Sequence, residues 1–394
     1  MVRYSLEDVD DEMVLGESIV LPSGKLLLGA GTCISKRYKE RLKELGYQSL
    51  LINEPGTENV RPETIVSQQS HAELSASSEE ATEKIAKIMD KFRASSSENL
   101  HKLIFEKRRD LNKFIMNSTV ARQLETIIEQ IMNQSEIVLN LAALKGSSNS
   151  YLQHAVNVTI TSLCIGKKHN FSYEEIKQLA TGALNYHMGL TAIPKSVLNK
   201  KNEFTESERK LFRKHTVYGY LMLSQNSQIP ATSAIVALQH HELQNGKGYP
   251  MGLKGSNRPP AKDISQTHVI HRFAEIVSVA DTYHTLISVE DPGMNHTKTV
   301  IKKLIKLGGE YLNREIVKTL ISIVPVYPVG ARVRITDAPS AQLTKYIGVI
   351  CKDNPNDLSR PQIILYETTN KQRVNPPILI DTAKAPGIQF ELYV

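Results

Sequence analysis

Apolar positions in the middle of the chain recur with a helical period. A spacing of three and four residues places apolar side chains on one face of a helix. The positions that follow it are Ile85, Ile88, Met89, Leu124, Ile127, Ile128 and Ile131. We expect a helical connector over residues 81–146 and a helical domain over residues 147–325, whose apolar faces form either a core or a partner-binding surface, with the core favoured. Two capping boxes, Ser172 with Glu175 and Thr205 with Glu208, mark helix starts.

Both ends of the chain have a different pattern. Residues 21–28 contain Pro and Gly between apolar positions, which indicates a strand, a turn and a strand. A helix over Lys36–Leu45, with Ser35 as its cap and Gly46 as its end, and a strand over Ser49–Asn53 complete a small α/β unit at residues 1–55. Residues 56–80 are rich in Ser and Gln, which predicts a polar linker.

In the last part of the chain, apolar and polar residues alternate. Val329, Ala331, Val333 and Ile335 are separated by polar neighbours, as in a half-buried strand. We therefore expect a small β unit over residues 326–394. The predicted fold is mainly α, with an all-helical domain between a small α/β unit and a small β unit.

The composition excludes several classes of protein. Of the 394 residues, 41% are hydrophobic and 23% are charged, as in an ordinary globular protein. No apolar run approaches the roughly 20 residues of a membrane span, and the first residues do not resemble a signal peptide; we expect no membrane insertion and a cytoplasmic location. The isolated Cys33, Cys164 and Cys351 predict neither disulfides nor a thiolate zinc site. The net charge of +7 arises from interleaved charges, as in residues 36–44, which does not indicate nucleic-acid binding.

A pair of adjacent histidines is the main chemical signal. His240, His241 and Glu242 follow an apolar helical stretch at residues 231–238 and precede a glycine-rich segment at residues 245–250. Neighbouring residues on a helix point about 100° apart. Both imidazoles therefore reach one metal only if the helix end distorts, and otherwise two metals must lie between them.

These residues carry a resemblance to a known family. The His-His-Glu run followed by Gly248, Tyr249 and Pro250 resembles the HD-GYP family, a branch of the HD phosphohydrolase superfamily. The likeness extends over residues 147–325, through the segments 151–158, 193–200, 213–215 and 279–283 in family order. The N-terminal unit and the C-terminal β unit also resemble accessory parts of some members.

The resemblance implies a metal-dependent phosphodiesterase that hydrolyses cyclic di-GMP. Such sites hold two or three ions, often iron or manganese, which polarise the phosphodiester and activate a water molecule. Position by position, the residues that match metal ligands are His154, His215, His240, His241 and Asp281. Gly248, Tyr249 and Pro250 are weaker candidates for binding substrate, since they also serve to shape the loop.

The sequence departs from the family at its naming motif. Members have Leu-His-Asp-Ile-Gly-Lys where this chain has residues 185–190, Asn-Tyr-His-Met-Gly-Leu. Gly189 sets the register, which puts Tyr186 at the metal histidine, His187 at the bridging aspartate and Leu190 at the lysine. A shift by one residue makes His187 the histidine but puts Met188 at the aspartate. A carboxylate bridges two cations, whereas a neutral imidazole offers one lone pair.

The candidate metal ligands that remain fit a single metal ion better than two. Residues 290–293, where members carry a phosphate-binding arginine element, contain two carboxylates and no arginine. His215, His240 and His241, with His187 as fourth ligand, suit one divalent transition metal (Fe, Mn, Zn, Ni or Co), and a two-metal centre is not expected. Alternatively, the histidines hydrogen-bond to one another or to Asp281 without metal. We assign no catalytic residue.

Three functions follow from this reasoning. The favoured hypothesis is a cyclic di-GMP-related signalling protein whose degenerate HD-GYP domain lacks or is impaired in hydrolysis and acts through binding or protein partners. The alternative is an active, metal-dependent cyclic di-GMP phosphodiesterase with an altered metal site. A third, weaker hypothesis is a receptor that binds cyclic di-GMP without cleaving it. The sequence does not indicate the oligomeric state.

Overall fold

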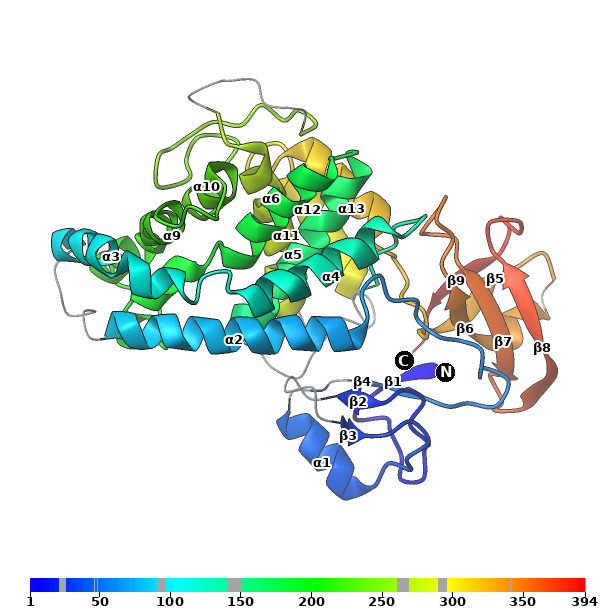
Figure 1. Ribbon diagram of the computed structural model, residues 1–394. Helices are drawn as coiled ribbons and strands as arrows, with labels where there is room; N and C mark the ends of the chain where they lie inside the picture. The colour runs from blue at the N-terminus through cyan, green and yellow to red at the C-terminus, as the bar shows by residue number, and fades with distance from the viewer. Residues whose placement is uncertain are drawn as a thin grey trace.

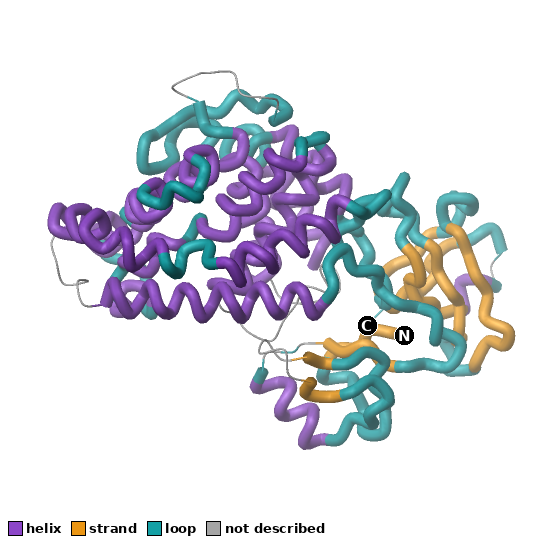
Figure 2. Tube along the Cα trace, viewed as in Figure 1, coloured by secondary structure: helices purple, strands orange, loops and turns teal. Residues whose placement is uncertain are grey.

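The chain folds into a helical domain flanked by two smaller units that contain the strands (Figures 1 and 2). The computed structural model describes residues 1–20, 26–45, 47, 49–90, 97–140, 151–200, 202–260, 269–289, 296–340 and 342–393. The expected turn at residues 21–25, the helix end at Gly46 and the carboxylates of residues 290–293 lie outside the described residues. The mainly helical fold with a small unit at each end, as expected from the sequence, is confirmed.

The N-terminal unit contains two strand pairs and one helix. Strand β1 (Val2–Ser5) pairs antiparallel with β4 (Ser49–Ile52), and β2 (Ile19–Val20) pairs antiparallel with β3 (Leu26–Leu28). Helix α1 (Lys36–Glu44) begins after Ser35, whose side chain accepts a hydrogen bond from the Tyr38 amide. The sequence therefore located this helix and its cap correctly.

Helix α2 (Gln68–Asp90) begins inside the segment that we expected to be a polar linker. Its serines are small enough to be buried at close helix contacts, and Ser70, Ser75 and Ser78 are all buried. Leu74 enters the main core of the helical domain, and Met89 enters a second core. The linker prediction failed because it counted apolar side chains and ignored small residues that pack without them. Residues 68–80 are therefore helical rather than a linker.

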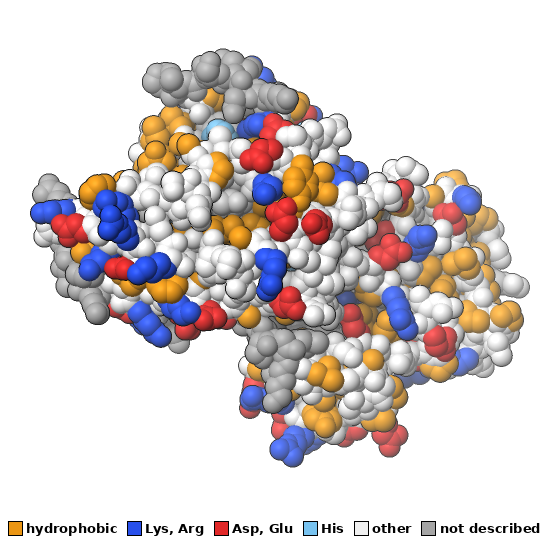
Figure 3. Space-filling view, in the orientation of Figure 1, with side chains coloured by type: hydrophobic (Ala, Val, Ile, Leu, Met, Phe, Trp, Pro, Cys, Tyr) orange, Lys and Arg blue, Asp and Glu red, His pale blue; other side chains and the backbone are white. Residues whose placement is uncertain are grey.

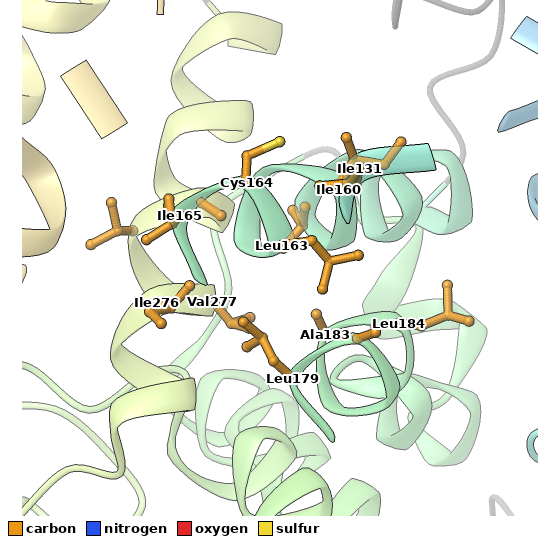
Figure 4. Close-up of a cluster of buried hydrophobic side chains, with 14 of the residues drawn as sticks. Ile131, Ile160, Leu163, Cys164, Ile165, Leu179, Ala183, Leu184, Ile276 and Val277 are labelled. Atoms are coloured by element: carbon orange, nitrogen blue, oxygen red, sulfur yellow. The ribbon is translucent and has the colours of Figure 1, made fainter. Parts of the chain in front are cut away.

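The helical domain is built around α5, α6 and α11 (Figure 4). Its helices are α3 (Ser97–Asn112), α4 (Ser118–Met132), α5 (Tyr151–Lys168), α6 (Tyr173–Asn185), α7 (Lys195–Leu198), α8 (Glu206–Arg213), α9 (His215–Ser224), α10 (Ala231–Gln239), α11 (Arg272–Val289), α12 (His296–Leu307) and α13 (Arg314–Ile323), with the short 3-10 helix η2 (Met188–Ala192). Leu163 of α5, Leu179 of α6 and Val277 of α11 are fully buried against one another in the main core. Both predicted capping boxes are present, at the starts of α6 and α8.

A second core fixes η2 beside α2 and α9. Met188 and Leu190 of η2 pack with Met89 of α2 and with Tyr218 and Met222 of α9. Leu190, which we expect at the position of the family's lysine, is only 8% exposed. Its side chain therefore contributes to packing, and the segment after His187 is held rigidly against the neighbouring helices.

The C-terminal unit is a five-stranded antiparallel sheet with the order β8-β7-β6-β5-β9. Its strands are β5 (Arg332–Asp337), β6 (Tyr346–Lys352), β7 (Gln362–Thr368), β8 (Arg373–Asp381) and β9 (Gln389–Leu392), with the short 3-10 helix η3 (Leu343–Lys345) before β6. The alternation of Val333 and Ile335 with polar neighbours produced the expected strand, and both side chains are buried.

The two ends of the chain pack together (Figure 1). The Arg3 amide donates to the Gly330 carbonyl at 2.7 Å, and Val2 lies in the same core as Val333. The Arg332 guanidinium lies 5.1 Å from the centre of the Tyr4 ring. The N-terminal unit and the C-terminal sheet are therefore joined by backbone, apolar and cation–π contacts.

The surface carries charges of both signs. On the face in Figure 3, Lys and Arg side chains are interspersed with Asp and Glu side chains. Within the described residues, none of the helices combines the length and the apolarity that crossing a membrane requires.

Candidate metal centre

The predicted site residues come from separate helices of the helical domain. His154 lies in α5 and Asp281 in α11, whereas His215 is the first residue of α9. His240 ends α10 as its C-cap residue, so the chain leaves the helix between His240 and His241. This helix end is the distortion that allows two adjacent histidines to face one site.

A close backbone approach brings His187 to the other histidines. Gly189 of η2 packs against α9, where an added Cβ would lie 1.9 Å from the His215 carbonyl oxygen and 2.5 Å from the Gly219 nitrogen. Any side chain at position 189 would therefore push η2 away from α9. This glycine keeps His187, two residues earlier, within reach of His215.

Four histidines form one compact cluster. His187, His215, His240 and His241 each offer a ring nitrogen, and these four atoms lie within 4.8 Å of one another. Two ligands of a tetrahedral zinc ion, each at about 2.0–2.1 Å from the metal, lie roughly 3.3 Å apart. The Nε2 atoms of His215 and His240 are 3.3 Å apart. The wider pairs of the cluster meet the same geometry only after side-chain adjustment.

The hydrogen bonds of His215 and His240 show that this contact needs a cation. His215 Nδ1 lies 2.7 Å from the Phe212 carbonyl oxygen, and His240 Nδ1 lies 3.0 Å from the Ala237 carbonyl oxygen. Carbonyl oxygens only accept, so each Nδ1 carries a proton and each neutral ring presents a lone pair at Nε2. The two lone pairs then face each other, an arrangement that requires a proton or a metal ion between them.

Burial of His215 and His240 disfavours a proton between their Nε2 atoms. Burial, together with the neighbouring His241, lowers the pKa of His215 to about 4. Burial and the surrounding histidines hold the pKa of His240 well below its ordinary value. Near neutral pH both rings are therefore neutral, and the donor set fits one divalent metal ion. His187 supports this fit, since its buried Nδ1 has no hydrogen-bond partner within the described residues.

Asp281 does not join the histidine cluster directly. Its Oδ1 accepts a hydrogen bond from His154 Nε2 at 2.7 Å and from the Tyr186 hydroxyl at 2.5 Å. Burial acts to raise the pKa of Asp281, but these two donors outweigh it and keep the pKa below its ordinary value. The carboxylate is thus ionised and already bonded to two protein donors. Of the predicted ligands, His154 and Asp281 form a separate pair beside the four histidines.

Tyr186 lies between this pair and the cluster. Its ring stacks on His187 with centroids 3.8 Å apart, and it is fully buried. Burial and the adjacent Asp281 raise the pKa of Tyr186 well above its ordinary value, so the phenol stays protonated and donates to Asp281. The sequence placed Tyr186 at the position of a metal histidine but gave no signal for this role as hydrogen-bond donor.

The loop after the histidines is fixed by Glu242. Its buried carboxylate accepts hydrogen bonds from the Met251 amide at 2.7 Å and the Leu253 amide at 2.8 Å. An added Cβ at Gly248 would lie 2.4 Å from the Leu243 nitrogen, which explains the glycine. Tyr249 stacks on His241 with centroids 4.7 Å apart, whereas Pro250 is exposed. The bracing role of Glu242 has no sequence signal beyond its place after the two histidines.

Comparisons with known proteins show which domain the central part of this chain resembles. Residues 131–315 match the model of the HD domain. A cyclic di-GMP phosphodiesterase of Pseudomonas aeruginosa is 24% identical over 66% of this chain and 59% of its own length. The cyclic di-GMP phosphodiesterase response regulator RpfG of Xanthomonas campestris is 30% identical over 44% of this chain and 40% of its own length. The match therefore spans about half the length of these curated relatives.

A solved structure of an HDG"Y"P protein from Bdellovibrio bacteriovorus aligns with 82% of this chain and 98% of that chain, at 16% identity and a TM-score of 0.42. The four histidines lie within the segment that matches the HD domain model, and the curated relatives of the chain are named as cyclic dinucleotide phosphodiesterases.

Proposed function

We propose that this protein is a cyclic di-GMP signalling protein whose HD domain holds a single metal ion and does not hydrolyse phosphodiesters. The observation that carries the proposal is the arrangement of Asp281. Its Oδ1 accepts from His154 and from Tyr186, and the position of a bridging aspartate is taken by His187. No carboxylate among the described ligand candidates is then left to join two cations.

The charge of the site supports this proposal. Two divalent ions close together need anionic ligands to offset their repulsion. The four clustered histidines are neutral ligands, and Asp281 adds one negative charge beside them. One divalent ion is therefore the loading that the site can stabilise.

The same residues argue against hydrolysis. Catalytic metal sites keep an open position for water, whereas four protein ligands close a tetrahedral ion, as in structural sites. When bound, such an ion would link η2, α9 and the end of α10. We propose that His187, His215, His240 and His241 hold it, and that the protein acts through ligand binding or a protein partner rather than through turnover.

The four imidazole ligands also limit which metal ions the site can bind. Imidazole nitrogen suits zinc, iron, nickel and cobalt, whereas manganese prefers carboxylate and water oxygen. We therefore propose one ion of the first group, with manganese disfavoured by the loss of the bridging carboxylate.

The test combines metal analysis and turnover on the same preparation. We expect about one metal ion per chain in anaerobically purified protein, and neither linear dinucleotide nor GMP from cyclic di-GMP. The matched control is His101→Ala, an exposed histidine on α3, which is expected to retain the ion. Two ions per chain, or hydrolysis that depends on added Mn²⁺ or Fe²⁺ and disappears in His240→Ala, would overturn the proposal and establish the active phosphodiesterase instead.

A further inference from the structure

An arginine is stacked at the outer side of the histidine cluster. The Arg213 guanidinium lies 4.8 Å from the centre of the Tyr249 ring, and the Tyr249 ring stacks on His241 with an angle of 24°. His241 in turn contacts His240 with ring centroids 4.2 Å apart. A series of ring contacts therefore runs from the buried cluster through His241 and Tyr249 to an exposed cation.

The guanidinium is not occupied by the protein. Arg213 is exposed at the last position of α8, and within the described part of the chain its side chain has no hydrogen-bond acceptor and no ion-pair partner. A guanidinium that lies over an aromatic ring without a protein acceptor can present its N–H groups to a planar, bidentate anion. The stacking on Tyr249 also reduces the freedom that the side chain would lose on binding.

The chain needs such a cation if it binds a nucleotide at this site. Leu190 occupies the position of the family's lysine and is buried in packing, so it offers no charge to a phosphate. Arg213 is placed to supply that charge from the solvent side of His241.

Resting on the proposed function, we propose that Arg213, oriented by Tyr249, is an anion-recognition residue that binds the phosphodiester oxygens of a cyclic dinucleotide beside the histidine cluster. The two non-bridging oxygens of a phosphodiester match the two parallel N–H groups of the guanidinium edge. A lysine provides the charge without this fork.

The test is titration calorimetry of the metal-loaded full chain with cyclic di-GMP. We expect Arg213→Gln to weaken binding by at least 10-fold and Arg213→Lys by less. The matched control is Arg209→Gln, which removes the same charge one turn earlier on α8 from another exposed arginine. We expect its affinity to equal that of the wild type. Metal content is measured for every variant and is expected to stay constant, which separates lost recognition from a damaged centre.

Different results would refute the role of Arg213 and the proposed function of the protein. Equal affinities of Arg213→Gln and Arg209→Gln, or no binding of cyclic di-GMP by the wild type, would refute the role of Arg213. If both variants lose the same affinity for cyclic di-GMP, and inorganic phosphate competes equally well with the dinucleotide in both, the binding reflects only general anion attraction. That result also refutes the role of Arg213. Hydrolysis of cyclic di-GMP by the wild type would instead overturn the proposed function. The ratio of the affinities of Arg213→Gln and Arg209→Gln would then still measure the contribution of Arg213 to binding.

Discussion

The Tyr186 hydroxyl donates a hydrogen bond to Asp281 Oδ1 across 2.5 Å. Because the phenol keeps its proton, it satisfies the carboxylate in the way that a cation would in a two-metal site. Under the proposed function, Tyr186 and His187 act together. His187 stands where we expect the bridging acid of an HD motif, and Tyr186 donates to Asp281, the acid that remains.

The double variant Tyr186→His and His187→Asp is expected to gain a second metal ion. The aspartate would supply an oxygen bridge, and the loss of the phenol would free Asp281 for coordination. Elemental analysis should show about one additional ion per chain when the variant is prepared with iron or manganese. Tyr186→Phe is the control, since it removes the hydrogen bond but adds no ligand. A double variant that still binds one ion would show that Tyr186 and His187 are not what limits the site to one metal.

Removal of the metal is expected to lower the stability of the wild type but not that of His215→Ala. Loss of one imidazole from the cluster should weaken metal binding roughly 100-fold or more, since even changes in the hydrogen bonds around metal ligands cost 10–100-fold. A ligand present at 100 times its Kd stabilises the folded state by about 2.7 kcal/mol. Thermal unfolding with and without a chelator measures the difference. His101→Ala should respond as the wild type does, and an equal response of His215→Ala would exclude His215 as a ligand.

Gly189→Ala is expected to disrupt both packing and the metal centre. The new Cβ would meet the His215 carbonyl at 1.9 Å, so η2 or α9 must move. Overpacking of this kind typically costs about 1–3 kcal/mol, and the shift separates His187 from His215. The free energy of unfolding and the metal content should both fall. Gly29→Ala, where the nearest atom is 4.0 Å from the new Cβ, is expected to change neither. If Gly189→Ala keeps its metal and its stability, the close approach is not required.

Glu275 is expected to make stability fall as the pH rises from about 4.5 to 7. Burial raises the pKa of Glu275 to about 7, against the opposing hydrogen bonds from Gln244 and Asn313. A raised folded pKa means that the native state holds its proton more tightly than the unfolded chain. This stabilisation is complete below pH 4.5 and is lost as the pH rises through 7, by about 3 kcal/mol in total.

Glu275→Gln cannot ionise, so its stability relative to the wild type should rise by about 3 kcal/mol between pH 4.5 and 7.5. Denaturant titrations at several pH values measure this difference. A difference for Glu275→Gln that stays constant with pH would show that the buried carboxyl titrates as in the unfolded chain.

The sequence predicted the helices and the terminal units, because periodicity carries that information, and the family resemblance pointed to the residues that meet in the histidine cluster. Ser35 and the two capping boxes located helix starts to the residue. The start of α2 was missed, since buried serines carry no apolar signal. The roles of Tyr186 and Glu242 were also missed. Tyr186 depends on Asp281 from a distant helix, and Glu242 depends on the backbone amides of the loop that follows it, so neither role has a local side-chain pattern.

The contact between Arg3 and Gly330 has a consequence for synthesis of the protein. The outer face of the N-terminal unit stays uncovered until residue 330 and the sheet strands after it have left the ribosome. The helical domain, with contacts closer in sequence, is expected to fold earlier. A nonsense mutation between residues 325 and 330 would therefore leave apolar surface of the N-terminal unit exposed.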